Sequence, residues 1–118
     1  MTNTLFREES FSLRFTKLSP DSASRVRDKL CEFNMTSRRA DIVSLDLNET
    51  LNLDPIYSFV ENGSLDPSTY SIWVSLITSS DHGGVSLPGY ILELARRTGA
   101  GIDFSFVASL DEGEAQEA

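Results

Sequence analysis

The chain has very little cysteine, histidine and tryptophan, with one of each among its 118 residues. A single cysteine, Cys31, excludes a disulfide within the chain and fits a reducing compartment. No apolar run approaches the roughly 20 residues that are needed to cross a bilayer, so no membrane is expected as a partner. The first residues also lack the basic-then-apolar order of a secretion signal. We therefore predict a cytoplasmic protein.

Basic residues are also scarce, because 10 Lys and Arg stand against 18 Asp and Glu, for a net charge of −8. Phosphate contacts need clustered Lys and Arg, so this balance argues against nucleic acid as a partner. The one dense basic spot, Arg38-Arg39, is too short to change that conclusion. Much of the acidity lies in residues 111–118, for which we predict a disordered acidic tail. Residues 1–110 are predicted to form a single α+β domain.

Four segments alternate apolar and polar residues, which is the pattern of half-buried strands. They are residues 9–17, 40–47, 69–78 and 101–108. In the first of them, Phe11, Leu13 and Phe15 share one face, and Ser12, Arg14 and Thr16 share the other. In the third, Tyr70, Ile72, Val74 and Leu76 share one face, and Trp73, Ser75 and Ile77 take the other. In the last, Ile102, Phe104 and Phe106 point one way.

Helical periodicity separates these strands. The first helix is predicted to begin at Ser19-Pro20, where Ser19 accepts a backbone N–H and Pro20 suits the first helical position. Asn34 is predicted to end it in a left-handed conformation. Its inward stripe consists of Ala23, Val26, Leu30 and Phe33. The second main helix is predicted to be capped by Ser86 and to end at Gly99, with Leu87, Ile91, Leu94 and Ala95 facing inward.

The segment between residues 48 and 67 leaves two alternatives open. Asp54-Pro55 is a start signal for a short helix that would end at Asn62-Gly63. The alternative is an irregular loop that covers an edge of the core.

This order of elements predicts an α+β protein. The expected arrangement is a ferredoxin-like split βαβ sandwich, in which an antiparallel sheet carries two main helices on one face.

With these elements placed, the chain resembles a bacterial family of uncharacterised proteins, domain of unknown function 4279. The matching pieces are Ser12-Leu13-Arg14-Phe15, Ser19-Pro20, Ser86-Leu87-Pro88 and the run from Gly99 to Phe104. They are strand and helix-cap motifs that cover about two-thirds of the chain, and residues 40–66 depart from the pattern. The resemblance implies no catalytic residues.

Few residues offer chemistry. His82, beside Asp81 in a polar, Gly-rich turn, lacks the surroundings of a catalytic triad, and the composition of the turn explains it. Asp41, Asp46, Glu49 and Asp54 fail the spacing of a calcium loop, so solvated surface carboxylates are the preferred interpretation. Cys31 follows the inward-facing Leu30, and we predict that it is buried or half-buried. No cofactor, no metal and no catalytic residue is predicted.

Trp73 is the strongest candidate for an interaction site. If Ile72 and Val74 point into the core, Trp73 and Ile77 stand on the face without helices, near Arg14 and Val107. An exposed Trp is a common anchor of protein contacts. Two alternatives stay open, in which residues 48–67 cover the indole or a homodimer buries it.

These features predict a non-enzymatic binding module that uses its open sheet face, with a protein partner or a second copy of itself. The alternatives are a toxin-neutralising immunity protein, favoured by small size and acidity, and a small-ligand sensor. An enzyme ranks last, because no catalytic set is present in the sequence.

Overall fold

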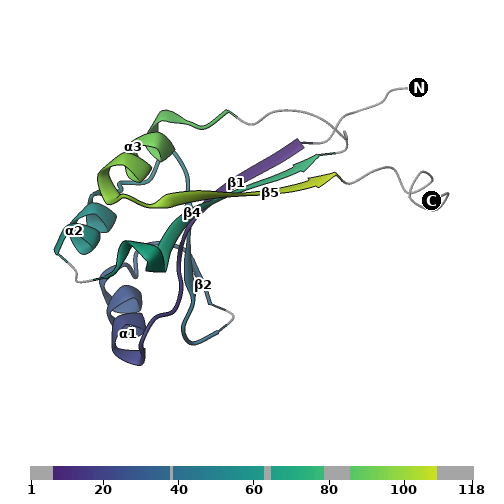
Figure 1. Ribbon diagram of the computed structural model, residues 1–118. Coiled ribbons are helices and arrows are strands. Elements are labelled where there is room, and N and C mark those ends of the chain that lie inside the picture. The colour runs from purple at the N-terminus through teal and green to yellow at the C-terminus, as the bar shows by residue number, and fades with distance from the viewer. Residues whose placement is uncertain (1–6, 38, 63–64, 79–85, 109–118) are drawn as a thin grey trace, which may run out of the picture.

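The computed structural model describes residues 7–37, 39–62, 65–78 and 86–108. In this part of the chain a five-stranded mixed sheet is combined with three α-helices (Figure 1), which confirms the α+β class. The strands are β1 (Arg7–Phe15), β2 (Met35–Thr36), β3 (Val43–Leu47), β4 (Tyr70–Thr78) and β5 (Gly101–Ala108). The helices are α1 (Pro20–Lys29), α2 (Asp54–Asn62) and α3 (Gly89–Thr98), and the 3₁₀ turn η1 (Pro67–Thr69) leads into β4. No helix among these residues is long and apolar enough to cross a membrane.

The strand order is β2-β3-β1-β4-β5, and it corrects the predicted topology. β1 pairs antiparallel with β3 and with β4, whereas β5 runs parallel to β4, so the sheet is mixed rather than antiparallel. A split βαβ unit places another strand between the two parallel strands. Here β4 and β5 are direct neighbours joined through α3, so this unit is not split. Alternation fixes which side chains share a face, but not which strands are neighbours, and that is why the prediction failed.

The predicted faces of the strands are confirmed by burial. Alternate residues of the three central strands are buried, and they share one core cluster with residues from all three helices. The strand residues in that cluster include Leu13, Phe15, Val43, Leu45, Leu47, Ile72 and Val74, and the helices add Ala23, Val26, Ile56, Tyr57, Ile91 and Leu94. The predicted stripe of the first helix is buried as expected, with Leu30 at the C-terminal cap position of α1 and Phe33 beyond it.

The start of α1 is as predicted, but its end is not. The Ser19 side chain accepts a hydrogen bond from the Ser22 N–H at 3.1 Å, and Pro20 is the first helical residue. The helix ends at Leu30, and Asn34 does not have the predicted left-handed conformation. The Asn34 carbonyl instead accepts the Asp46 N–H at 2.9 Å, because the chain there is already pairing with β3. The two-residue strand β2 follows, which the sequence pattern did not reveal.

α3 begins later than predicted. Pro88, not Ser86, occupies the cap position, and no side chain caps the helix. The residue before a proline is driven to extended backbone, so Leu87 cannot be the first helical residue after a Ser86 cap. At the other end Gly99 has a φ of 75°, the left-handed conformation that glycine adopts without a steric penalty, so the predicted exit is confirmed.

The segment from residue 48 to 67 contains a helix, as the first of the two alternatives predicted. α2 has nearly the same length as the other two helices, and its buried residues Ile56 and Tyr57 belong to the core cluster. Arg97 of α3 lies 3.7 Å from the ring centroid of Tyr57 and donates to the Glu61 carboxylate at 3.2 Å. These contacts join α2 to α3 above the core.

Burial of tyrosines predicts the response of the fold to alkaline pH. The Tyr70 hydroxyl donates to the Thr98 carbonyl at 2.9 Å, and burial raises the pKa of Tyr70 above its ordinary value of 10.0. Burial also raises the pKa of Tyr57 and of Tyr90. When the pKa of a group is higher in the folded state than in the unfolded state, the group stabilises the fold fully at pH values below its unfolded-state pKa. That stabilisation is lost as the pH rises through the folded-state pKa.

We therefore expect the melting temperature to fall above about pH 10 through these tyrosines. Tyr70→Phe should reduce the fall in melting temperature at alkaline pH. At neutral pH it should lower the free energy of unfolding by about 1 kcal/mol, because the hydrogen bond to Thr98 is missing. Circular-dichroism melts between pH 7 and 12 measure both effects. If the melting temperatures of wild type and Tyr70→Phe fall equally steeply with pH above about pH 10, Tyr70 does not contribute to the loss of stability at alkaline pH.

Candidate functional site

The sheet has a second face, opposite the core, which we call the open face. Directly paired residues of neighbouring strands project to the same face, so the strand registers define its members. They are Glu8, Ser10, Ser12 and Arg14 of β1, Thr36 of β2, Ser44 and Asp46 of β3, Ser71, Trp73, Ser75 and Ile77 of β4, and Asp103 and Ser105 of β5. None of these side chains is fully buried. The open face is therefore a serine-rich surface with one large aromatic ring.

Trp73 lies near the middle of the open face. Its direct neighbours across the sheet are Ser12 on β1 and Asp103 on β5. The guanidinium carbon of Arg14 lies 4.1 Å from the centroid of the indole, in a cation–π contact. The Arg14 Nε also donates to the Ser44 hydroxyl at 3.3 Å, which fixes the guanidinium over the ring. The structure thus brings together two of the predicted site residues, Trp73 and Arg14.

The other two predicted residues extend the same surface along β4 and β5. Ile77 is half-buried, and its register partner on β5 is Val107. The side chain of Val107 lies outside the described part of the structure. The buried residues of α2, Ile56 and Tyr57, belong to the same core cluster as Ile72 and Val74, and along β4 these two side chains project to the face opposite that of Trp73.

The indole of Trp73 is equipped for a polar contact as well as an apolar one. Its N–H has no hydrogen-bond partner among the described residues, and no buried side-chain nitrogen or oxygen among them is left without a partner. The indole N–H is therefore within reach of solvent or of a binding partner.

The serine hydroxyls of the open face make few side-chain contacts within the described part of the chain. A nucleophilic serine needs a general base within hydrogen-bond reach. Within the described residues, the only side-chain hydrogen bond to any of these hydroxyls comes from Arg14, a donor that cannot act as a base. His82 and Asp81 lie outside the described residues.

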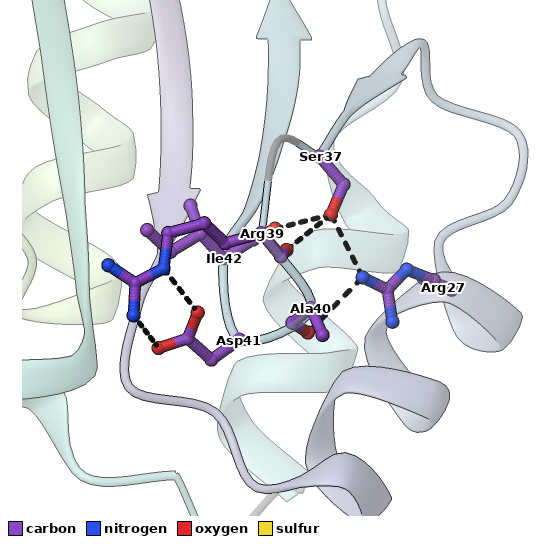
Figure 2. Close-up of polar contacts among 6 residues, drawn as sticks. All are labelled: Arg27, Ser37, Arg39, Ala40, Asp41 and Ile42. Atoms are coloured by element: carbon purple, nitrogen blue, oxygen red, sulfur yellow. Dashed lines mark hydrogen bonds and ion pairs between the residues drawn. The ribbon is translucent and has the colours of Figure 1, made fainter.

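Arginines elsewhere are used to hold a loop together, as Figure 2 shows. One Nη of Arg27, on α1, donates to the Ser37 hydroxyl at 2.9 Å and to the Ala40 carbonyl at 3.3 Å. The Ser37 hydroxyl in turn lies within hydrogen-bond distance of the Arg39 and Ile42 carbonyls. Arg39 is paired with Asp41 at 3.1 Å. Arg27 thus fastens the loop between β2 and β3 to α1, and Arg39 forms its ion pair within that loop.

A hollow of about 390 Å³ lies between α1 and α2. It is lined by one stripe from each helix, namely Arg25 and Lys29 of α1 and Pro55, Ser58, Phe59 and Asn62 of α2. Neither Arg25 nor Lys29 has an ion pair or a hydrogen bond with a described residue. The hollow thus has an apolar floor and a basic rim in a chain that is acidic overall.

The acidic residues that were considered for calcium are used elsewhere or stand apart. Asp41 pairs with Arg39, and Asp46 accepts a hydrogen bond from the Asn34 amide at 2.7 Å. No group of three or more metal-ligating side chains gathers in the described ranges. Cys31 is exposed, so its predicted burial is wrong: α1 ends at Leu30, which takes the buried position, and the chain turns outward directly after it.

Sequence reasoning missed the exposure of two aromatic rings. Phe104 and Phe106 alternate on β5 as predicted, but their side chains are 61% and 48% exposed. Their strand is the last in the sheet order, and Figure 1 shows it extending well beyond α3. The signal that could have found them is the absence of a further amphipathic segment to cover this end of the sheet.

Comparison of the chain with protein-family models, with curated proteins and with solved structures gives no match. The resemblance noted from the strand and cap motifs therefore stays a prediction.

Proposed function

We propose that the protein is a non-enzymatic binding module that recognises a protein partner through its open face. The observation that supports this most is the half-buried Trp73 under the fixed guanidinium of Arg14, surrounded by small hydroxyl side chains. Tryptophan and arginine are the residue types that most often dominate binding energy at protein interfaces. All three helices contribute their buried residues to the core cluster, and in our proposal they pack together on that side and leave the open face for the partner.

The charges of the open face indicate the character of the partner. Asp46 and Asp103 are exposed and lie at opposite ends of the cross-strand row that contains Ser12 and Trp73. A partner with an apolar centre and Lys or Arg at its rim would match this arrangement, because complementary charge steers association and fixes register.

The chain contains only one tryptophan, so its fluorescence reports on this face alone. Affinity capture from the source cell with immobilised wild-type protein supplies the partner. With the purified partner we expect a blue shift of Trp73 emission on binding, and about 30-fold weaker affinity for Trp73→Ser, since a hot-spot Trp contributes about 2 kcal/mol or more. Leu92→Ser is the matched control, because Leu92 is an exposed apolar residue on α3. A partner that binds wild type and Trp73→Ser equally well would overturn the proposal.

A second candidate function, a small-ligand sensor, is supported by the hollow between α1 and α2. Its volume of about 390 Å³ falls within the range of small-molecule sites. The unpaired Arg25 and Lys29 favour an anionic ligand with an apolar body. A thermal-shift screen of such acids tests it, because ligand binding raises the stability of the folded state. Hits that persist in an Arg25→Gln, Lys29→Gln double variant would count against this site.

The immunity-protein alternative also remains a proposal, with its motivation in small size and acidity, and it shares the cytoplasm as the proposed location. If a neighbouring gene encodes a basic toxin and the protein captures that toxin, the immunity role is favoured over that of a general protein-binding module. A gene neighbourhood without a toxin would remove its support.

A further inference from the structure

Two of the largest exposed apolar side chains lie on the edge strand of the sheet. Among the described residues three large hydrophobic side chains are exposed, namely Leu92 on α3 and Phe104 and Phe106 on β5. The two phenylalanines lie on the same face of the edge strand, two residues apart, so they form one continuous apolar strip.

The backbone of this edge also has no neighbouring strand in the part of the chain that the structure describes. β5 pairs with β4 on one side only, and its outer edge has no partner strand among the described residues. Natural proteins protect long edge strands with proline, with charged side chains, lysine above all, or with a bulge, and the one charged residue of β5 is Asp103. β5 has the sequence GIDFSFVA, which contains no proline and no lysine, and its register with β4 runs unbroken from Gly101 to Ala108. This edge is therefore suited to receive another strand.

The sequence of the strand makes a second copy of the same chain a fitting occupant. Around Ser105 the aromatic residues are symmetric, with Phe104 before it and Phe106 after it. In an antiparallel pairing centred on Ser105, Phe104 of one copy lies directly opposite Phe106 of the other. Directly opposite residues share a face, so the four rings meet on one side of the joined sheet. Asp103 then faces Val107 of the other copy, so the two Asp103 carboxylates are not opposed.

The exposed area sets the strength of such a contact. A phenylalanine that exposes about half of a buriable surface of about 200 Å² leaves about 220 Å² per copy for the two rings together, and about 440 Å² for two copies. A stable interface buries about 1,200 Å² or more in total, so the edges of the two strands must supply the remainder. This balance implies a dimer that dissociates at low concentration. The net charge of −8 per chain opposes association, so salt should strengthen it.

We propose that β5 is the seam of a homodimer, in which two copies pair antiparallel about Ser105 and form one continuous ten-stranded sheet. This inference goes beyond the proposed function and uses a different surface, since the open face remains free. The two-fold axis is perpendicular to the sheet, so both open faces lie on the same side of the dimer.

Sedimentation equilibrium from about 1 to 500 µM tests whether β5 forms the dimer interface. The wild type is compared with variants in which exposed β5 side chains are replaced by charged ones. Wild type should approach twice its 13.1 kDa mass as concentration rises, more readily in 0.5 M than in 0.05 M NaCl. Phe104→Lys and Phe106→Glu should each be monomeric throughout. Both positions are exposed, so the variants should keep the wild-type circular-dichroism spectrum, and Phe106→Ser replaces any variant that does not.

Mixing the variants tests the register. Phe104→Lys and Phe106→Glu together should form a heterodimer, because the lysine of one chain then faces the glutamate of the other while the remaining two phenylalanines still pair. Phe104→Lys mixed with Phe104→Glu should stay monomeric, because the two charges are no longer opposite. A monomeric wild type at 500 µM would overturn the proposal. A dimer that persists in Phe104→Lys but is lost in Trp73→Ser would overturn it in favour of the open face, and a dimer that persists in both would also overturn it.

Discussion

Ile72→Asp is expected to prevent folding, whereas Trp73→Asp on the neighbouring residue should leave the fold intact. Ile72 is fully buried in the core cluster, whose buried members are all aliphatic or aromatic side chains. An unpaired carboxylate at that position would have to lose its hydration without compensation, which destabilises by several kcal/mol. A domain of this size has a total stability of only about 5–15 kcal/mol. Trp73 projects to the open face, where a carboxylate keeps contact with water.

Far-ultraviolet circular dichroism and amide NMR dispersion distinguish the two variants. Ser75→Asp, one step further along the open face on the same strand, is the matched control and should also remain folded. A folded Ile72→Asp together with an unfolded Trp73→Asp would mean that the two faces of the sheet are the reverse of those described.

Phe15→Ala should lower the free energy of unfolding by about 3–5 kcal/mol. The Phe15 ring is fully buried, and its centroid lies 6.1 Å from that of Phe59 and 6.0 Å from that of Tyr70. Truncation removes these aromatic contacts and leaves a cavity where β1, α2 and β4 meet. Because surrounding side chains relax only in part, the loss exceeds the transfer free energy of the ring alone.

Phe104→Ala is the matched control, since it removes the same ring from a position that is 61% exposed. It should change stability by no more than about 0.5 kcal/mol. Urea unfolding followed by Trp73 emission, at low protein concentration to avoid self-association, measures both variants. Similar losses for the two would show that Phe15 does not hold this part of the core together.

Sequence reasoning succeeded where side-chain geometry is local. A strand turns successive residues to opposite faces, so the alternation around Leu13, Ile72 and Val74 was sufficient to identify the core face and to place Trp73 away from it. Ser19-Pro20 identified the start of α1, because one side-chain acceptor and one fixed φ satisfy the first helical turn. These features depend on only a few consecutive residues.

It failed where the outcome depends on neighbours distant in the sequence. The position of β5 beside β4 depends on how α3 crosses the sheet, and alternation within β5 contains no information about that. The pairing of Asn34 with Asp46 ended α1 earlier than its own periodicity indicated. The failure at Ser86 was different, because Pro88 carried the necessary information two residues away.

For the candidate site, the sequence identified Trp73 and Arg14 but not their contact. The two residues lie on different strands, and the cation–π geometry requires the β1–β4 register, which pairs Arg14 with Ser71. The exposed Phe104 and Phe106 were missed for a related reason. Their strand pattern is that of a core-facing strand, and only the extension of β5 beyond α3 leaves them uncovered.

The central position of β1 in the sheet affects how the chain folds during its synthesis. β1 is the first strand in the described part of the chain, yet both of its neighbours, β3 and β4, come later in the sequence. A nascent chain on the ribosome therefore displays Leu13 and Phe15 without their β4 partners, Ile72 and Tyr70, until β4 has emerged. Such long-range pairing slows folding and leaves apolar strands open to aggregation. Chaperone binding to nascent chains that end before residue 70 should accordingly exceed binding to chains that include all of β4.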